Sequence, residues 1–302
     1  MRNLHTKKII FALAMIFPLS GFTYANSADY VNQSTVKAQN IAIEKQREER
    51  KVFNNNFAIT LHNPTYILPY YYTGSPYNSI YENQTPSDES LKHNEVKYQF
   101  SFKIPVWHDM FLSSTSLFFA YTQLSYWQVY NKNAFFRSTD YEPEFFTRTP
   151  INWNVAGNWF LNIFKLGAVH QSNGFGNYME RSWNRVYIEM TASNDHAFLS
   201  IKPWYVFHDS TYELYNPDMA KYLGYGQVVL GYKYNNQTIS LQAHSFIERH
   251  GRYATGTLRY TFPINKRLAG IVEVFSGYGQ SLIEYNHRTN SAGVGFALNN
   301  FI

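Results

Sequence analysis

A strict two-residue alternation is the feature that most constrains this chain. In "VKYQFSFKI", residues 96–104, apolar and polar side chains exchange places at every step. One phase holds Val96, Tyr98, Phe100, Phe102 and Ile104, and the other is polar or charged. Because successive side chains of a strand point to opposite faces, this pattern predicts a β-strand with one apolar and one polar face.

Similar alternating stretches follow along most of the chain, separated by turn-forming residues. With residues 96–104 they make about twelve strands, and an even number suits an antiparallel barrel. The others are 61–72, 115–129, 144–154, 158–172, 183–191, 197–207, 225–234, 239–247, 255–262, 269–277 and 291–302.

Composition places this barrel in a membrane. The chain has 26 Tyr, 24 Phe and 6 Trp, yet its mean hydropathy is only −0.38. Many aromatic residues without long apolar runs favour an all-β transmembrane antiparallel barrel of the outer membrane, with lipid outside and a polar lumen. The absence of cysteine from the sequence excludes disulfides, a thiolate nucleophile and cysteine metal ligands.

The first residues have the pattern of an export signal. A basic start precedes the short apolar run "IIFALAMIF" and a cleavage position near Ala25. An uncleaved anchor is the alternative, but the run is short for a membrane span. We expect a signal peptide at 1–25, a polar extension at 26–56 and the barrel at 57–302. Without the leader, 23 basic face 21 acidic side chains, a balance that gives no reason to expect a nucleic-acid partner.

Two neighbouring stretches carry polar residues on a face that is otherwise apolar. In 158–172 one phase contains Phe160, Phe164, Leu166 and Ala168, with Asn162 as its exception, and continues to His170 and Ser172. In 183–191 the apolar phase begins with Asn184. Since these stretches would pair as a hairpin, we expect His170, Ser172 and Asn184 to be neighbours on the lipid-facing wall.

Polar groups facing lipid are costly unless they satisfy one another. Asn184 can accept from one ring nitrogen of His170 while the other nitrogen takes the Ser172 proton, which would make the hydroxyl oxygen a nucleophile. The alternative is ordinary chemistry for each residue: an interfacial histidine, an unremarkable serine and a turn asparagine.

The motifs "HQSNG" and "RSWNR" resemble the active-site region of the outer-membrane phospholipase A family. The similarity extends to "YTQLSYWQ", "FRSTDYEPEFF", "IKPWYV", "KYLGYGQ" and "SGYGQSLIEYN", and covers most of the chain after about residue 63. The resemblance implies a twelve-stranded outer-membrane barrel that hydrolyses the acyl esters of phospholipids, with A1, A2 and lysophospholipase activity.

The resemblance also implies individual roles. His170 would be the base, Ser172 the nucleophile and Asn184 the residue that orients the base. Gly174 would help the Ser172 N–H to hold the oxyanion, although a plain turn glycine is an equal alternative.

Calcium and a homodimer as the active form are further implications of the resemblance. The ligands would be the carbonyl of Phe175 and the side chains of Glu180 and Asn133, where the family has serines at the last two positions. Oxygen donors of this kind suit Ca²⁺. Asp209 or Glu213 could add an acidic ligand, and Glu180 could instead be a solvated loop residue.

Gln123 is the residue that the resemblance places at the dimer interface. It sits within the apolar phase of "TSLFFAYTQLSYW". An unpaired amide facing hydrocarbon is costly, so a partner barrel could satisfy it. Alternatively, Gln123 lies at the bilayer edge and meets water.

Two other functions fit parts of the sequence. A non-enzymatic porin or adhesin barrel would explain the alternation, the aromatic residues and the leader, but not the three polar residues on the outer wall. A barrel esterase acting on non-lipid esters would share the catalytic residues and differ in substrate.

Overall fold

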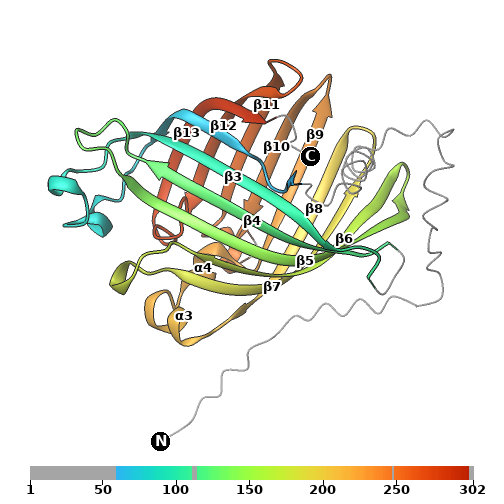
Figure 1. The fold of residues 1–302 in the computed structure, drawn as a ribbon, viewed down its shortest axis with the longest axis horizontal. Helices are drawn as coiled ribbons and strands as arrows, with labels where there is room; N and C mark the ends of the chain where they lie inside the picture. The colour runs from blue at the N-terminus through green and yellow to red at the C-terminus, as the bar shows by residue number, and fades with distance from the viewer. Residues whose placement is uncertain (1–58, 111–113, 247, 299–302) are drawn as a thin grey trace, which may run out of the picture.

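A computed structural model describes residues 59–110, 114–246 and 248–298. The expected signal peptide (1–25), the polar extension (26–56) and the last residues of the expected final strand lie outside the described residues. Within them the chain forms one antiparallel sheet that curls into a barrel (Figure 1).

The strands follow one another around this barrel. They are β1 (Thr60–Leu61), β2 (Tyr66–Thr73), β3 (Asn94–Trp107), β4 (Ser116–Trp127), β5 (Phe136–Ala156), β6 (Trp159–Ser172), β7 (Ser182–Ser193), β8 (Ala197–Phe207), β9 (Gly226–Tyr234), β10 (Gln237–His244), β11 (Thr255–Pro263), β12 (Leu268–Tyr278) and β13 (Arg288–Leu298).

The pairing closes the sheet. Each strand from β2 to β13 pairs with its neighbours in sequence, and β13 pairs with β2, so no edge is left open in this ring of twelve strands. The two-residue β1 pairs with β3. The predicted fold, an antiparallel transmembrane barrel of about twelve strands, is confirmed, and closure satisfies the backbone hydrogen bonds as a membrane requires.

Short helices occupy the loops. They are η1 (Asn78–Tyr81), η2 (Pro86–Asp88), η3 (Asn177–Met179), α3 (Ser210–Tyr215), α4 (Met219–Leu223) and η4 (Glu248–Gly251). All of them lie in connections at one end of the barrel, which include the longest ones, and in the described residues the connections at the other end carry no helix. Outer-membrane barrels carry their longer loops on the outside of the cell. No helix in the described residues is long and apolar enough to cross a membrane.

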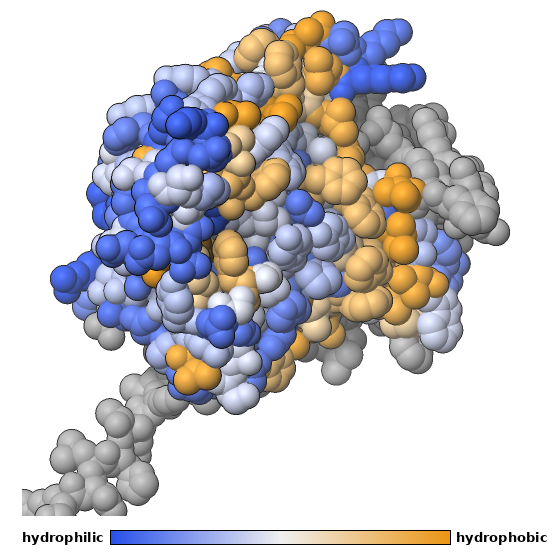
Figure 2. All heavy atoms as spheres, turned by 60° about the vertical axis from the view of Figure 1, so that its left-hand side comes forward, coloured by the Kyte–Doolittle hydropathy of each residue, from blue (hydrophilic) through white to orange (hydrophobic). Residues whose placement is uncertain are grey.

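The two faces of the strands differ as the alternation predicts. On β3, Phe100 is 48% exposed, whereas its neighbour Ser101 is fully buried and Lys103 is buried as well. Figure 2 shows hydrophilic side chains gathered over the loop-bearing end and hydrophobic ones on the barrel wall beside it. The barrel therefore has an apolar outside and a polar inside.

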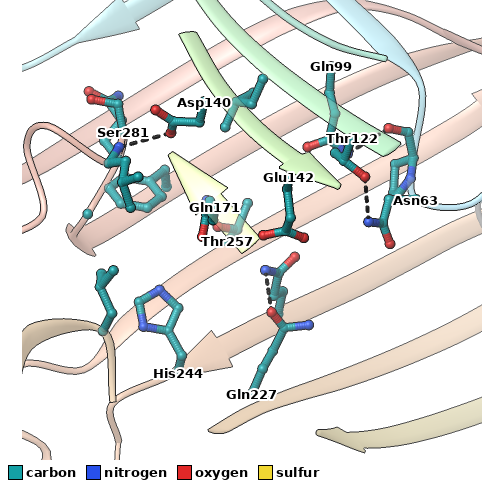
Figure 3. A pocket seen from close by; sticks show the side chains of 18 of the residues that line it. Asn63, Gln99, Thr122, Asp140, Glu142, Gln171, Gln227, His244, Thr257 and Ser281 are labelled. Carbon is teal, nitrogen blue, oxygen red and sulfur yellow. Dashed lines mark hydrogen bonds between the residues drawn. The ribbon is translucent and has the colours of Figure 1, made fainter. Parts of the chain in front are cut away.

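Ion pairs and hydrogen bonds cross the lumen. Glu273 accepts from Lys97 (2.6 Å) and from Arg259 (2.7 Å). A polar cavity of about 250 Å³ remains (Figure 3), where Asp140, Glu142 and other side chains lie across from residues of the opposite wall. Since buried charges are costly unless paired, these networks hold the interior in one arrangement.

Three differences from the sequence expectation have a clear local cause, and the first concerns the stretch 61–72. It splits into β1 and β2 because the chain leaves the ladder at Asn63 and Pro64. Pro64 has no N–H to donate, and the backbone N–H of Asn63 donates to the side-chain Oγ of Ser101 (3.0 Å) instead of to a strand carbonyl.

β5 begins at Phe136, well before the expected start at 144. The charged residues that hide this part of the strand point inward. Arg137 is buried and pairs with Glu95 (2.7 Å) and Glu284 (2.9 Å). A strand with charged side chains on its lumen-facing side has an amino-acid composition like that of a loop, so its first part is not recognised as a strand.

Asn162, the exception in the apolar phase of β6, does not face lipid. The β6–β7 register shifts between Leu161 and Ile163, and Asn162 is fully buried, where it accepts from Ser193 Oγ (2.6 Å). The bulge turns this one side chain inward.

Candidate active site

The β6–β7 hairpin positions the three polar residues singled out from the sequence. In its register His170 lies opposite Asn184, and Ser172 lies opposite Ser182, at the end of the barrel that carries the long loops. His170 is exposed, in the same phase as Leu166, which is 52% exposed. Asn184 and Ser172 are half-buried in the outward phases of their strands. The structure thus brings all three to one patch of the outer wall.

The imidazole and the amide contact each other directly. His170 Nδ1 and Asn184 Oδ1 are 2.8 Å apart, so the ring nitrogen donates to the amide oxygen. Opposite residues of an antiparallel pair have close Cβ atoms, which explains why a short amide reaches the ring. His170 Nε2 is then the nitrogen able to take a proton.

Asp209 extends the hydrogen-bonded pair of His170 and Asn184 to a third residue. Asn184 Nδ2 donates to Asp209 Oδ2 (2.7 Å), while Asp209 Oδ1 accepts from the backbone N–H of Tyr212 (2.9 Å) and caps α3. Sequence reasoning considered Asp209 only as a calcium ligand. The available signal was an aspartate at the start of a short helix, a common N-cap, but the sequence could not show that the cap lies beside Asn184.

Ser172 lies in the same pocket as His170 and Asn184, an open hollow of about 330 Å³. In the described residues its hydroxyl has no hydrogen-bond partner, so the link from Ser172 Oγ to His170 is not formed. Catalytic hydrogen bonds are often looser without substrate and tighten when it binds. The hydroxyl therefore faces a space open to a ligand.

Gly174 begins the loop and is required there by its conformation. Its φ is +68°, and a Cβ would lie 2.8 Å from the Tyr141 ring. Larger residues therefore meet both strain and a clash. This requirement holds whether or not the Gly174 N–H contacts an oxyanion.

The loop between β6 and β7 is held by internal hydrogen bonds. Asn173 is buried; its side-chain oxygen accepts from the N–H of Phe175 (3.3 Å) and of Arg181 (3.0 Å), and its amide donates to the carbonyl of Met179 (2.8 Å). Burial lowers the pKa of the Arg181 guanidinium, which donates to the carbonyl of Tyr178 (2.9 Å). These hydrogen bonds fix the loop that forms one side of the pocket.

The residues named as calcium ligands are only partly brought together. Phe175 and Glu180 line the pocket with Ser172, so a carbonyl and a carboxylate are available there, and hard oxygen donors fit Ca²⁺. Asn133, in the β4–β5 loop, is not among the lining residues; its amide donates to Glu89 (2.8 Å) in the β2–β3 connection.

The two acidic alternatives are already engaged. Both Asp209 oxygens accept from protein donors, and Glu213 pairs with His208 (2.7 Å). The described residues contain no group of three or more His, Cys, Asp or Glu side chains placed to hold a metal.

Gln123 faces outward on β4, as expected, but its amide is not unpaired. It accepts from the Tyr121 hydroxyl (3.0 Å) and donates to Ser125 Oγ (3.2 Å). Neighbours on the same face of the strand thus engage the amide oxygen and one of its two N–H groups, and the place of Gln123 at a dimer interface stays a prediction.

Comparison with known proteins gives consistent results. The model of the family described as Phospholipase A1 matches residues 42–298. A relative from Neisseria meningitidis is 38% identical over 251 residues, which are 79% of this chain and 64% of that protein.

Two solved structures share the fold and about a third of the sequence. Outer membrane phospholipase A from Escherichia coli has a TM-score of 0.77 and 32% identity, covering 82% of this chain and 95% of that chain. The Salmonella typhi outer membrane phospholipase, a dimer with bound calcium, has a TM-score of 0.78 and 30% identity, covering 84% and 97%. The resemblance seen in the motifs is confirmed.

Proposed function

This chain belongs to the phospholipase A1 family and is a phospholipase of the outer membrane, and from that premise we propose that it works by a Ser–His–Asn mechanism with calcium. Ser172 is the nucleophile, His170 the general base and Asn184 the residue that orients the base. The substrates are the acyl esters of diacyl and lysophospholipids, cleaved at either position.

The mechanism starts at the Ser172 hydroxyl. His170 Nε2 takes the Ser172 proton while Oγ forms a bond to the acyl carbonyl carbon. The tetrahedral intermediate expels the lysophospholipid oxygen, which takes that proton from His170 and leaves an acyl-serine. Water then attacks through the same base, releasing the fatty acid and restoring Ser172. Base catalysis of this kind contributes roughly 10²- to 10⁴-fold in rate.

The observation that carries the proposal is the 2.8 Å contact between His170 Nδ1 and Asn184 Oδ1 on the outer wall of the barrel. It points Nε2 away from the amide on a surface that faces lipid. A phospholipid can therefore reach the site laterally from the bilayer, without entering the lumen.

Calcium fits the oxygen donors of the pocket. The Phe175 carbonyl and the Glu180 carboxylate would hold the ion, which supplies positive charge for a developing oxyanion. Gly174 and Ser172 would contribute backbone N–H groups to the same oxyanion. The calcium bound to the Salmonella typhi phospholipase supports this assignment.

A homodimer is the proposed active form. The Salmonella typhi phospholipase is a dimer, and Gln123 presents an amide on the outer wall of β4 for a second barrel. Asn133 does not line the pocket of its own chain. It would serve as a ligand only when supplied by the second copy, which would make calcium binding depend on dimer formation.

Fatty acid release from mixed phospholipid micelles tests the proposal. The wild type should release fatty acid with calcium and lose most of this activity with chelator, and Ser172→Ala should be inactive in both conditions. Ser276→Ala, which removes an exposed serine from β12, is the matched control and should retain wild-type activity. Equal rates for wild type and Ser172→Ala would end the proposed mechanism, and faster cleavage of short soluble esters than of phospholipid would end the proposed substrate class.

A further inference from the structure

We propose that Asp209 is a positioning residue of the active site, which fixes the Asn184 amide and through it the tautomer of His170. The inference rests on the proposed function and extends the Ser–His–Asn chain by a carboxylate. Its basis is the 2.7 Å hydrogen bond from Asn184 Nδ2 to Asp209 Oδ2.

The carboxylate settles which way the amide faces. A side-chain amide can rotate to exchange its oxygen and nitrogen, and either orientation could meet an imidazole. A carboxylate only accepts hydrogen bonds, so the Asn184 nitrogen must point to Asp209. The Asn184 oxygen then faces His170.

The orientation of the amide in turn fixes the ring. An amide oxygen only accepts, so His170 Nδ1 must carry the hydrogen that joins them at 2.8 Å. In the neutral imidazole this leaves Nε2 as the acceptor. The base is thereby set in the tautomer that can take a proton from Ser172. Without Asp209, the reversed amide would favour the hydrogen on Nε2, and the ring could not act as the base.

Asp209 is itself held firmly. Its second oxygen caps α3 at Tyr212, whose fully buried side chain accepts from the backbone N–H of Ala220 (3.1 Å). The same loop clamps the end of β7, because Asn216 exchanges hydrogen bonds with the backbone of Ser182 (3.0 and 3.1 Å). The carboxylate is thus fixed relative to the strand that carries Asn184.

The negative charge of Asp209 is also opposite in sign to the positive charge that develops on the His170 ring. When His170 takes a proton, a negative charge beyond the amide stabilises the cation. The other charged residues that line this pocket are Glu180 and Arg181, and the neighbouring His208–Glu213 pair lies on the solvent side of α3. Asp209 is the one whose carboxylate contacts Asn184.

Two substitutions separate positioning from helix capping. Asp209→Ser keeps one oxygen for a good N-cap but removes the second oxygen, which accepts from Asn184. Asp209→Asn keeps the shape of the side chain, yet it offers one acceptor where the wild type uses two. Asp218→Asn is the control: it removes a carboxylate from the same loop, where Asp218 accepts from the Tyr285 hydroxyl, outside the pocket.

Steady-state phospholipid hydrolysis is the first measurement. We expect both Asp209 variants to lower kcat roughly 10- to 100-fold, by analogy with the outer partners that orient metal-binding histidines, with little change in KM or melting temperature. Asp218→Asn should match the wild type. An inactive wild type would reject the proposed function, whereas an active wild type with unchanged kcat in Asp209→Ser would reject only the role of Asp209.

The tautomer of His170 is the second measurement, and a purely structural role would not alter it. In protein labelled with ¹⁵N-histidine, the His170 signals are identified by their loss in His170→Gln. The wild type should show the hydrogen on Nδ1, and Asp209→Ser should show a shift toward hydrogen on Nε2. The same tautomer in both proteins would overturn the inference even if kcat fell.

Discussion

The lumen and the outer wall of this barrel both carry polar side chains, but they differ in whether those side chains have hydrogen-bond partners. Inside, Arg137 is buried and paired with Glu95 and Glu284. Outside, the chain of hydrogen bonds through Asn184 and His170 stops short of Ser172, whose hydroxyl has no partner in the described residues. Paired charges of this kind hold the fold, whereas the half-buried Ser172 hydroxyl on the outer wall is free to react.

Removing His170, the proposed base, should have the largest effect on the outer wall. We expect His170→Ala to lower kcat roughly 10⁴-fold, the upper end for general-base catalysis, equivalent to about 5.5 kcal/mol of transition-state stabilisation. The barrel should stay folded because the ring is exposed. We expect the variant to show the heat-dependent gel mobility of a folded barrel and to lose fatty acid release. Retained activity would show that another base serves Ser172.

Breaking a lumen pair should instead affect stability. Arg137→Met leaves Glu95 and Glu284 buried without their partner, which should cost about 3–5 kcal/mol in the free energy of unfolding. Urea unfolding in lipid vesicles measures it, with exposed Arg267→Met as the control. Activity per folded molecule should be unchanged. A loss of kcat without a loss of stability would contradict the assignment of stability to the lumen and of catalysis to the outer wall.

Asn184→Ala should lie between these extremes. It leaves the base in place without its orienting partner, so we expect kcat to fall roughly 10- to 100-fold and the melting temperature to change little. Asn154→Ala, on the same barrel but at the short-turn end, should not affect kcat. Equal losses of activity in both variants would indicate general damage to the barrel.

Gln123→Leu should have the smallest effect. Because Tyr121 and Ser125 already satisfy the amide, its loss should weaken dimerisation by only about 1 kcal/mol, the value of an ordinary hydrogen bond. Sedimentation in detergent with calcium measures the monomer–dimer constant. A change of 100-fold or more would mean that Gln123 exchanges its partners within the chain for one across the interface.

Much of the fold could be read from the sequence because a barrel imposes a two-residue period. The stretch 197–207 matches β8 to the residue, and the outward phases of β6 and β7 agree with the structure. The start of β5 escaped prediction because Arg137 and its neighbours place charges in the lumen, where ion pairs compensate them. Periodicity cannot distinguish such a strand from a polar loop.

The candidate site was predictable in part for the same reason. His170, Ser172 and Asn184 share an outward phase on adjacent strands, so strand pairing alone brings them together. Asp209 comes from the loop after β8, and loop paths follow from packing rather than from a period. The satisfied amide of Gln123 likewise depends on the rotamers of Tyr121 and Ser125, which no pattern reveals.

A covalent probe tests the central claim most directly, that the hydroxyl on the outer wall is an activated nucleophile. A long-chain alkyl fluorophosphonate reacts with serines that a base activates, and intact-mass and peptide analysis locate the adduct. We predict a single adduct on Ser172 that forms in the wild type and at least about 100-fold more slowly in His170→Ala. An adduct on another serine, or equal labelling of Ser172 in both proteins, would contradict it.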